Sequence, residues 1–170
     1  RFLPLIADGV WLLAEESGWQ LPAHNAVQRG GARAALPDTS RPIVDLFAAE
    51  TGAQLALIHQ LMAPQLDRLM PGLPDRIACE VRTRVLKPVL TEDFWWLGKA
   101  GGTNNWTAWC AQNVILAALT LPLDRATRRA ILSRAAGALQ AFRDEYPDDG
   151  ACEEGALYYR HGALCLWGGL

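Results

Sequence analysis

Two stretches of this chain carry the side chains that could do chemistry. The first, residues 146–162, reads YPDDGACEEGALYYRHG and gathers carboxylates, tyrosine hydroxyls and a histidine beside apolar residues. Such groups cost free energy to bury unless each finds a partner, and titratable groups held in one place can move protons. The cluster lies where an acidic turn leads into an apolar segment that favours a helix. We therefore expect a functional site at this junction.

The second stretch, residues 95–109, combines aromatic and amide side chains. Aromatic faces stack on sugar rings, because the axial C–H groups of a pyranose form an apolar face. An asparagine at a helix N-terminus can bind a carboxylate with the help of the helix dipole. Tryptophans that pack a core and asparagines that only cap a helix are the alternatives. The residues concerned are Trp95, Trp96, Trp106, Trp109, Asn104 and Asn105.

The rest of the chain supplies helices to hold these stretches. Apolar residues recur at helical spacing and hardly anywhere at the two-residue spacing of strands. Pro42 suits the first turn of a helix, whereas Pro64 and Pro88 are expected to end one. Asn104 or Asn105 and then Asp124 are suitable N-caps. The expected helices cover residues 2–16, 43–62, 75–87, about 105–121, about 125–145 and 152–166.

This pattern predicts an all-α fold in one domain spanning residues 1–170. Several helices are apolar on two sides and are joined by short Pro/Gly turns. That arrangement favours a layered array of antiparallel helix pairs, either a toroid or a solenoid, over a four-helix bundle. The apolar last residues and the absence of an initiating Met suggest a piece of a longer chain.

Composition excludes some classes of function. The net charge is −2, which gives no basic footprint for nucleic acid. No apolar run approaches the length of a membrane-spanning helix. The four cysteines, Cys79, Cys110, Cys152 and Cys165, lack metal-ligand spacing, and only three histidines occur. We therefore expect free thiols, no metal site and no cofactor in this chain.

The motifs NNWTAWC at 104–110 and YPDDGACEEGALYY at 146–159 resemble those of the heparinase II/III-like polysaccharide lyases. Two further similar stretches, WQLPAH at 19–24 and DLFAAET at 45–51, follow in the expected order. The resemblance implies the incomplete (α/α) toroid of that family, without its C-terminal β-sandwich region. It also implies cleavage of uronic-acid-containing glycans by β-elimination, in the periplasm or outside a bacterium, with the cytoplasm as the alternative location.

The resemblance assigns roles to individual residues. Asn105 would neutralise the uronate carboxylate, and Tyr158 would act as the acid or as both acid and base. Glu154 would orient the tyrosine or bind sugar hydroxyls. Members of the family often carry a histidine where this chain has Trp106. The resemblance therefore does not identify the second proton-transfer group. The expected substrate-binding residues are Trp96, Asn104, Trp106, Trp109, Glu154, His24 and His161.

Two other functions compete with the lyase. A toroid-type hydrolase would need two carboxylates across the scissile bond, and Glu154 with Asp149 or Asp45 would be the pair. A non-catalytic carbohydrate-binding or scaffold domain would need neither. The expected partner is an acidic polysaccharide or oligosaccharide, with no nucleic acid and no membrane; the residues indicate no oligomeric state.

Overall fold

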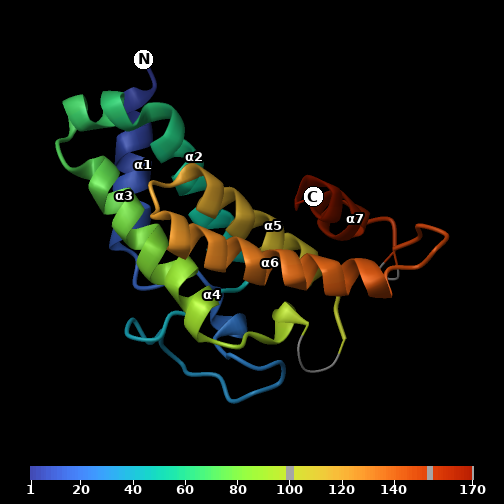
Figure 1. Ribbon diagram of the computed structural model, residues 1–170. Coiled ribbons are helices and arrows are strands. Elements are labelled where there is room, and N and C mark those ends of the chain that lie inside the picture. Colours follow the sequence, from blue (N-terminus) through green and yellow to red (C-terminus); the bar gives the residue numbers. More distant parts are fainter. Residues whose placement is uncertain (99–101, 153–154, 170) are drawn as a thin grey trace.

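The computed structural model describes residues 1–98, 102–152 and 155–169, and these form helices and connecting loops without any strand (Figure 1). The predicted all-α class is therefore confirmed. The α-helices are α1 (Leu3–Glu15), α2 (Leu46–Leu69), α3 (Leu73–Val81), α4 (Lys87–Thr91), α5 (Asn105–Thr120), α6 (Arg125–Glu145) and α7 (Tyr159–Gly169). Shorter helical turns are η1 (Pro22–His24), η2 (Arg82–Leu86) and η3 (Trp95–Leu97).

Helix α5 lies at the centre of the packing. It contacts α2, α6 and α7, and Figure 1 shows α6 beside it and α7 across its first half. Its buried positions include Ala108, Ala111, Ala117 and Ala118, whose small side chains let neighbouring helices come close. A helix that is apolar on nearly every side is expected to be enclosed in this way.

The N-terminal ends of three helices follow from side-chain capping. The carboxylate of Asp45 accepts the N–H of Ala48 at the start of α2, and Asp124 accepts that of Thr127 at the start of α6. Asn104 caps α5. Satisfying these unpaired N–H groups fixes where a helix begins. The caps at Asn104 and Asp124 are confirmed, whereas the helix expected from residue 43 begins at Leu46.

Two expected helix ends are wrong. Helix α2 continues past Pro64 to Leu69, where burial of Leu66 offsets the hydrogen bond that the proline cannot make. Helix α3 runs through η2 into α4 and past Pro88, because η2 is a wider π-helical turn. In this turn the N–H of Lys87 donates to the carbonyl of Arg82, five residues earlier.

The last helix also begins later than expected. Residues 155–158 form a turn, with the N–H of Tyr158 bonded to the carbonyl of Gly155, and α7 starts at Tyr159 rather than at Cys152. Gly155 adopts a φ of +82°, a conformation that breaks a right-handed helix and favours glycine. Tyr158 therefore precedes the helix instead of lying within it.

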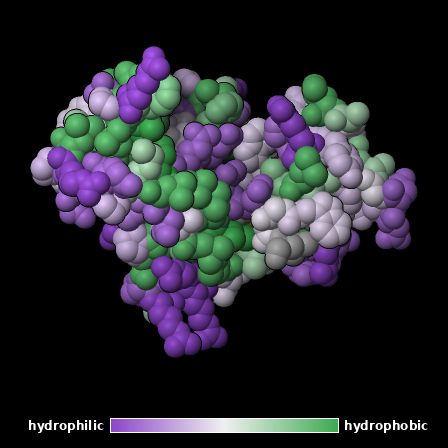
Figure 2. Space-filling view, turned by 90° about the horizontal axis from the view of Figure 1, so that it is seen from above, coloured by the Kyte–Doolittle hydropathy of each residue, from purple (hydrophilic) through white to green (hydrophobic). Residues whose placement is uncertain are grey.

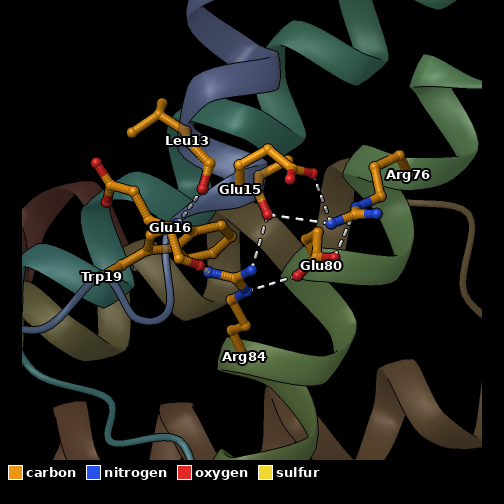
Figure 3. Close-up of polar contacts among 8 residues, drawn as sticks. Leu13, Glu15, Glu16, Trp19, Arg76, Glu80 and Arg84 are labelled. Atoms are coloured by element: carbon orange, nitrogen blue, oxygen red, sulfur yellow. Dashed lines mark hydrogen bonds and ion pairs between the residues drawn. The ribbon is translucent and has the colours of Figure 1, made fainter. Parts of the chain in front are cut away.

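Two arginines from α3 and η2 close the C-terminal end of α1 (Figure 3). The guanidinium of Arg84 donates to the carbonyls of Ala14 (2.9 Å) and Glu16 (2.5 Å) and pairs with Glu80 (2.5 Å). Arg76 donates to Ala14 as well and pairs with Glu80 at 2.7 Å. Carbonyls at a helix C-terminus lack partners within the helix, so these arginines act as its cap.

The face seen in Figure 2 carries hydrophobic patches between hydrophilic areas. Exposed large apolar side chains occur on α1, the later part of α2, and α7, and they include Leu5, Leu12, Leu61, Leu164 and Trp167. Within the described ranges, no helix combines the length and apolar character needed to cross a bilayer.

The cap on α1 gives a direct stability test. Arg84→Ala should lower the free energy of unfolding by about 2–3 kcal/mol, because two carbonyls and Glu80 lose a charged donor. Arg82→Ala is the matched control, since Arg82 lies in the same π-helical turn but is exposed. Urea unfolding should show the control within about 0.5 kcal/mol of the parent protein. Equal losses in the two variants would contradict the capping role.

Candidate functional site

The start of α5 presents an amide side chain to a pocket. Asn105 is the first residue of the helix and is only 8% exposed. Its side chain makes no hydrogen bond to any other residue that the structure describes. It lines a pocket of about 140 Å³, the Asn105 pocket, together with Thr103, Asn104, Glu145, Tyr146 and Cys152.

Asn104 holds this helix end in shape and leaves the neighbouring amide free. Its Oδ1 accepts the N–H of Trp106 at 3.0 Å, and its own N–H donates to Oγ1 of Thr107 at 3.4 Å. These reciprocal bonds form a capping box. Asn104 is thus engaged in capping, and Asn105 is the residue whose amide is available to a ligand. The positive end of the helix dipole favours an anionic ligand here.

A second pocket adjoins the same helix end. This Trp106 pocket has a volume of about 360 Å³, and Asn104 lines both pockets. Its aromatic walls are Trp95 and Trp106, whose ring centroids lie 4.9 Å apart. Arg29 lies over Trp95, with its guanidinium carbon 5.4 Å from the ring centroid. The principal lining residues are His24, Arg29, Arg33, Trp95, Asn104 and Trp106.

His24 belongs to the Trp106 pocket and is held from behind by a buried carboxylate. Its Nδ1 lies 2.7 Å from Oδ2 of Asp45, which is 1% exposed. The imidazole meets Trp106 edge-on, with ring centroids 4.6 Å apart. Asp45 also accepts the N–H groups of Leu21 (3.1 Å) and Ala48 (2.8 Å). One carboxylate therefore orients the histidine, anchors its loop and caps α2.

Helix α7 and the turn before it bring His161 and Tyr158 to the same end of α5 through aromatic contacts. The His161 ring stacks on Trp109, with centroids 4.1 Å apart and planes inclined by 5°. Tyr158 lies 6.0 Å from His161 between ring centroids and is 43% exposed. Trp109 follows Asn105 by one helical turn, so the two share a face of α5. Tyr158 itself does not line the Asn105 pocket.

Tyr146 is a further phenol beside Asn105. Its hydroxyl is buried and has no hydrogen-bond partner within the described part of the chain, and its ring lines the Asn105 pocket. Burial raises the pKa of this phenol. Glu145, on the same rim, accepts the hydroxyl and the N–H of Thr103, and these bonds lower the pKa of its carboxyl. Tyr146 therefore stays neutral while Glu145 is negatively charged.

One expected site residue, Trp96, lies in the core instead. Trp96 is 1% exposed, and its Nε1–H donates to the carbonyl of Val44 at 2.8 Å. This side chain belongs to the core and has no surface to offer a ligand, so its neighbour Trp95 replaces it in the candidate site. Glu154 lies outside the described residues, and its predicted role stays a prediction.

The carboxylate pair that a hydrolase would need does not appear in the described part of either pocket. Asp45 is buried and fully engaged, and Asp149 accepts the N–H of Ala151 in an exposed turn. Among the described residues that line the two pockets, Glu145 is the only acid. The described residues also contain no cluster of three metal-ligating side chains.

The cysteines are free thiols, as expected. Burial raises the pKa of Cys110 and brings that of Cys165 to about 11. Neither is a reactive nucleophile, since the thiolate is the attacking species.

Sequence reasoning missed the contributions of Arg29, Arg33 and Tyr146, and did not connect Asp45 to His24. The aromatic content of residues 95–109 predicts a sugar-binding surface, which stays a prediction, and does not indicate which tryptophan faces outward. The arginines lie in a Gly-rich loop whose path no periodicity predicts. Tyr146 opens the acidic stretch, yet its ring turns back onto Phe142, 5.3 Å away between centroids.

Comparison with models of known protein families finds no match, and a search of curated proteins finds none either. The resemblance to the heparinase II/III-like lyases therefore stays a prediction from the motifs in the sequence.

The central place of Asp45 predicts a large cost for its loss. Asp45→Ala should destabilise the protein by about 3 kcal/mol, because it removes a helix cap and leaves three donors without their acceptor. Asp124→Ala removes an exposed cap of the same type and should cost about 1 kcal/mol. Thermal and urea unfolding of the two variants measure the difference. Similar costs would show that the contacts to Leu21 and His24 add nothing.

Proposed function

We propose that this chain is the helical part of a polysaccharide lyase that cleaves a uronic-acid-containing glycan by β-elimination. The observation that carries the proposal is the amide of Asn105. It is nine-tenths buried, has no partner among the described residues and faces a pocket at the N-terminus of α5. A uronate carboxylate needs such a donor, because charge builds up on it when the C5 proton leaves.

The Trp106 pocket supplies the means to hold the sugar chain. Trp95 and Trp106 offer aromatic faces beside the amide site, and Arg29, Arg33 and His24 add positive charge or hydrogen-bond donors. A polyanion with apolar ring faces matches both properties. The combination favours an acidic glycan over a neutral one.

The groups that would transfer protons lie near the N-terminus of α5. β-Elimination breaks the C5–H and C4–O4 bonds, forms a C4–C5 double bond and needs a base for C5 and an acid for O4. Tyr158 is the proposed acid, since it is solvent-accessible and lies on the α7 side of the Asn105 pocket through His161 and Trp109. Tyr146 is the second phenol in reach of this region.

The proposal includes the fold, in which these helices are part of an (α/α) toroid. Helices α2, α6 and α7 pack around the central helix α5, and the exposed apolar side chains of α1 and α7 leave faces on which further helices would pack. A layered helical array of this kind supports an (α/α) toroid with its cleft at the start of α5.

A carbohydrate-binding domain without catalysis is the second candidate. One observation favours it. Tyr158 does not line the Asn105 pocket, so its phenol and the amide of Asn105 do not share a cavity. Binding of an acidic glycan by the Trp106 pocket would then be the whole function. A direct assay for elimination separates the two.

The assay uses the complete natural protein with heparan sulfate, chondroitin, hyaluronan, alginate and ulvan. Elimination conjugates the new double bond to the carboxylate, so product absorbs in the ultraviolet; hydrolysis gives reducing ends without this absorbance. Tyr158→Phe should reduce the rate about 100-fold or more, as for loss of a proton-transfer group. Tyr159→Phe is the matched control, since this neighbouring phenol is similarly exposed and lines neither pocket, and it should keep most of the activity. Reducing ends without absorbance on any glycan would contradict the lyase.

The role of Asn105 is tested by an isosteric change of charge. Asn105→Asp should weaken binding of a glucuronate oligosaccharide at least about tenfold, because two carboxylates would face each other. The melting temperature should change by less than about 4 °C, since the helix dipole favours an acid at this position. Asn113→Asp, two turns further along α5, controls for the added charge and should bind normally in calorimetric titration. Unchanged binding by Asn105→Asp would refute the assignment.

A further inference from the structure

The proposed elimination needs a base as well as an acid, and the chain offers three histidines for that role. His59 on α2 is half-buried, and burial lowers its pKa; it lines neither pocket at the start of α5. Nε2 of His161 accepts a hydrogen bond from Nε of Arg160 at 3.0 Å, and its ring lies flat on Trp109. His24 combines a carboxylate partner with a position in the larger pocket.

The contact with Asp45 fixes which nitrogen of His24 carries the proton. The two oxygens of Asp45 receive the backbone N–H groups of Leu21 and Ala48, which is the environment of a carboxylate anion. Such an oxygen accepts hydrogen bonds only, so Nδ1 of His24 must be the donor across the 2.7 Å contact. A neutral imidazole then has its lone pair on Nε2. This is the arrangement in which a buried aspartate prepares a histidine to accept a proton.

The surroundings of His24 leave Nε2 available to a ligand. This nitrogen has no hydrogen-bond partner among the residues that the structure describes, and the imidazole lines the Trp106 pocket. The ring is fixed on its other sides by Trp106 at 4.6 Å and Phe47 at 6.1 Å between centroids. Asn104 lines both this pocket and the Asn105 pocket, so the histidine and the proposed carboxylate site flank the same end of α5. Tyr158 approaches that site from α7 instead.

We infer that His24, oriented by Asp45, is the catalytic base of the elimination; this rests on the function proposed above. Nε2 takes the C5 proton and becomes imidazolium. The C5–H electron pair forms the C4–C5 double bond, the C4–O4 bond breaks, and O4 takes the proton of the Tyr158 hydroxyl. Products are an unsaturated uronate and a free hydroxyl, and solvent returns a proton to the phenolate and removes one from the imidazolium. Asp45 is a positioning residue that does not itself exchange a proton.

The test measures elimination by the complete natural protein and by His24→Ala, with ultraviolet absorbance as the readout. The variant should lose about 100-fold or more in kcat, with KM changed far less, because a base acts in the transition state. Added imidazole should restore activity by filling the space left next to the pocket, which a merely structural histidine would not allow. His59→Gln is the matched control and should keep the parent rate.

A second variant guards against misfolding. His24→Asn places an amide N–H where Nδ1 donates to Asp45 but cannot accept the C5 proton, so it should fold like the parent protein in circular dichroism and show the same loss of kcat. If the parent protein shows elimination and both folded His24 variants keep rates within about fivefold of the parent rate, the base assignment is wrong and the lyase function stands. Loss of rate that imidazole does not restore in folded His24→Ala would also overturn it. A parent protein without elimination on any glycan would remove the proposed function and this inference together.

Discussion

The buried carboxylate of Asp45 is the interaction on which the candidate site depends. It accepts hydrogen bonds from Leu21, His24 and Ala48, and so joins the loop before α2 to the core at a point that water does not reach. A charge in that position is stable only while all its donors remain. The loop carries His24, and the adjoining segment carries Arg29 and Arg33. The carboxylate of Asp45 and its three hydrogen-bond donors therefore hold the loop that lines the Trp106 pocket.

Helix α5 provides the second half of the site because it is enclosed along its length and open at its start. Its alanines pack against α2, α6 and α7, while its capping box presents Asn105 at the surface of a pocket. The arginines that cap α1 have a structural role, because they donate to the carbonyls of the helix end and pair with Glu80. Near α5, in contrast, Arg29 and Arg33 line the Trp106 pocket.

Local rules predicted most of the fold and only part of the site. Helical periodicity and the caps at Asn104 and Asp124 are local, so the all-α class and the limits of α5 and α6 could be predicted. The helix ends predicted at Pro64 and Pro88 are wrong, because tertiary burial and a π-helical turn override the tendency of proline to end a helix. Trp95 and Trp96 cannot be told apart by spacing, since the choice depends on the carbonyl of Val44, far away in the chain. The His24–Asp45 contact likewise joins distant segments.

The most direct measurement is a crystal structure of the complete Tyr158→Phe protein with a uronic-acid disaccharide. The account predicts the sugar carboxylate within hydrogen-bond distance of the Asn105 amide, a sugar ring against Trp95 or Trp106, and C5 facing Nε2 of His24. A disaccharide bound elsewhere, with Asn105 and both tryptophans untouched, would contradict the central claim that the start of α5 is a uronate site.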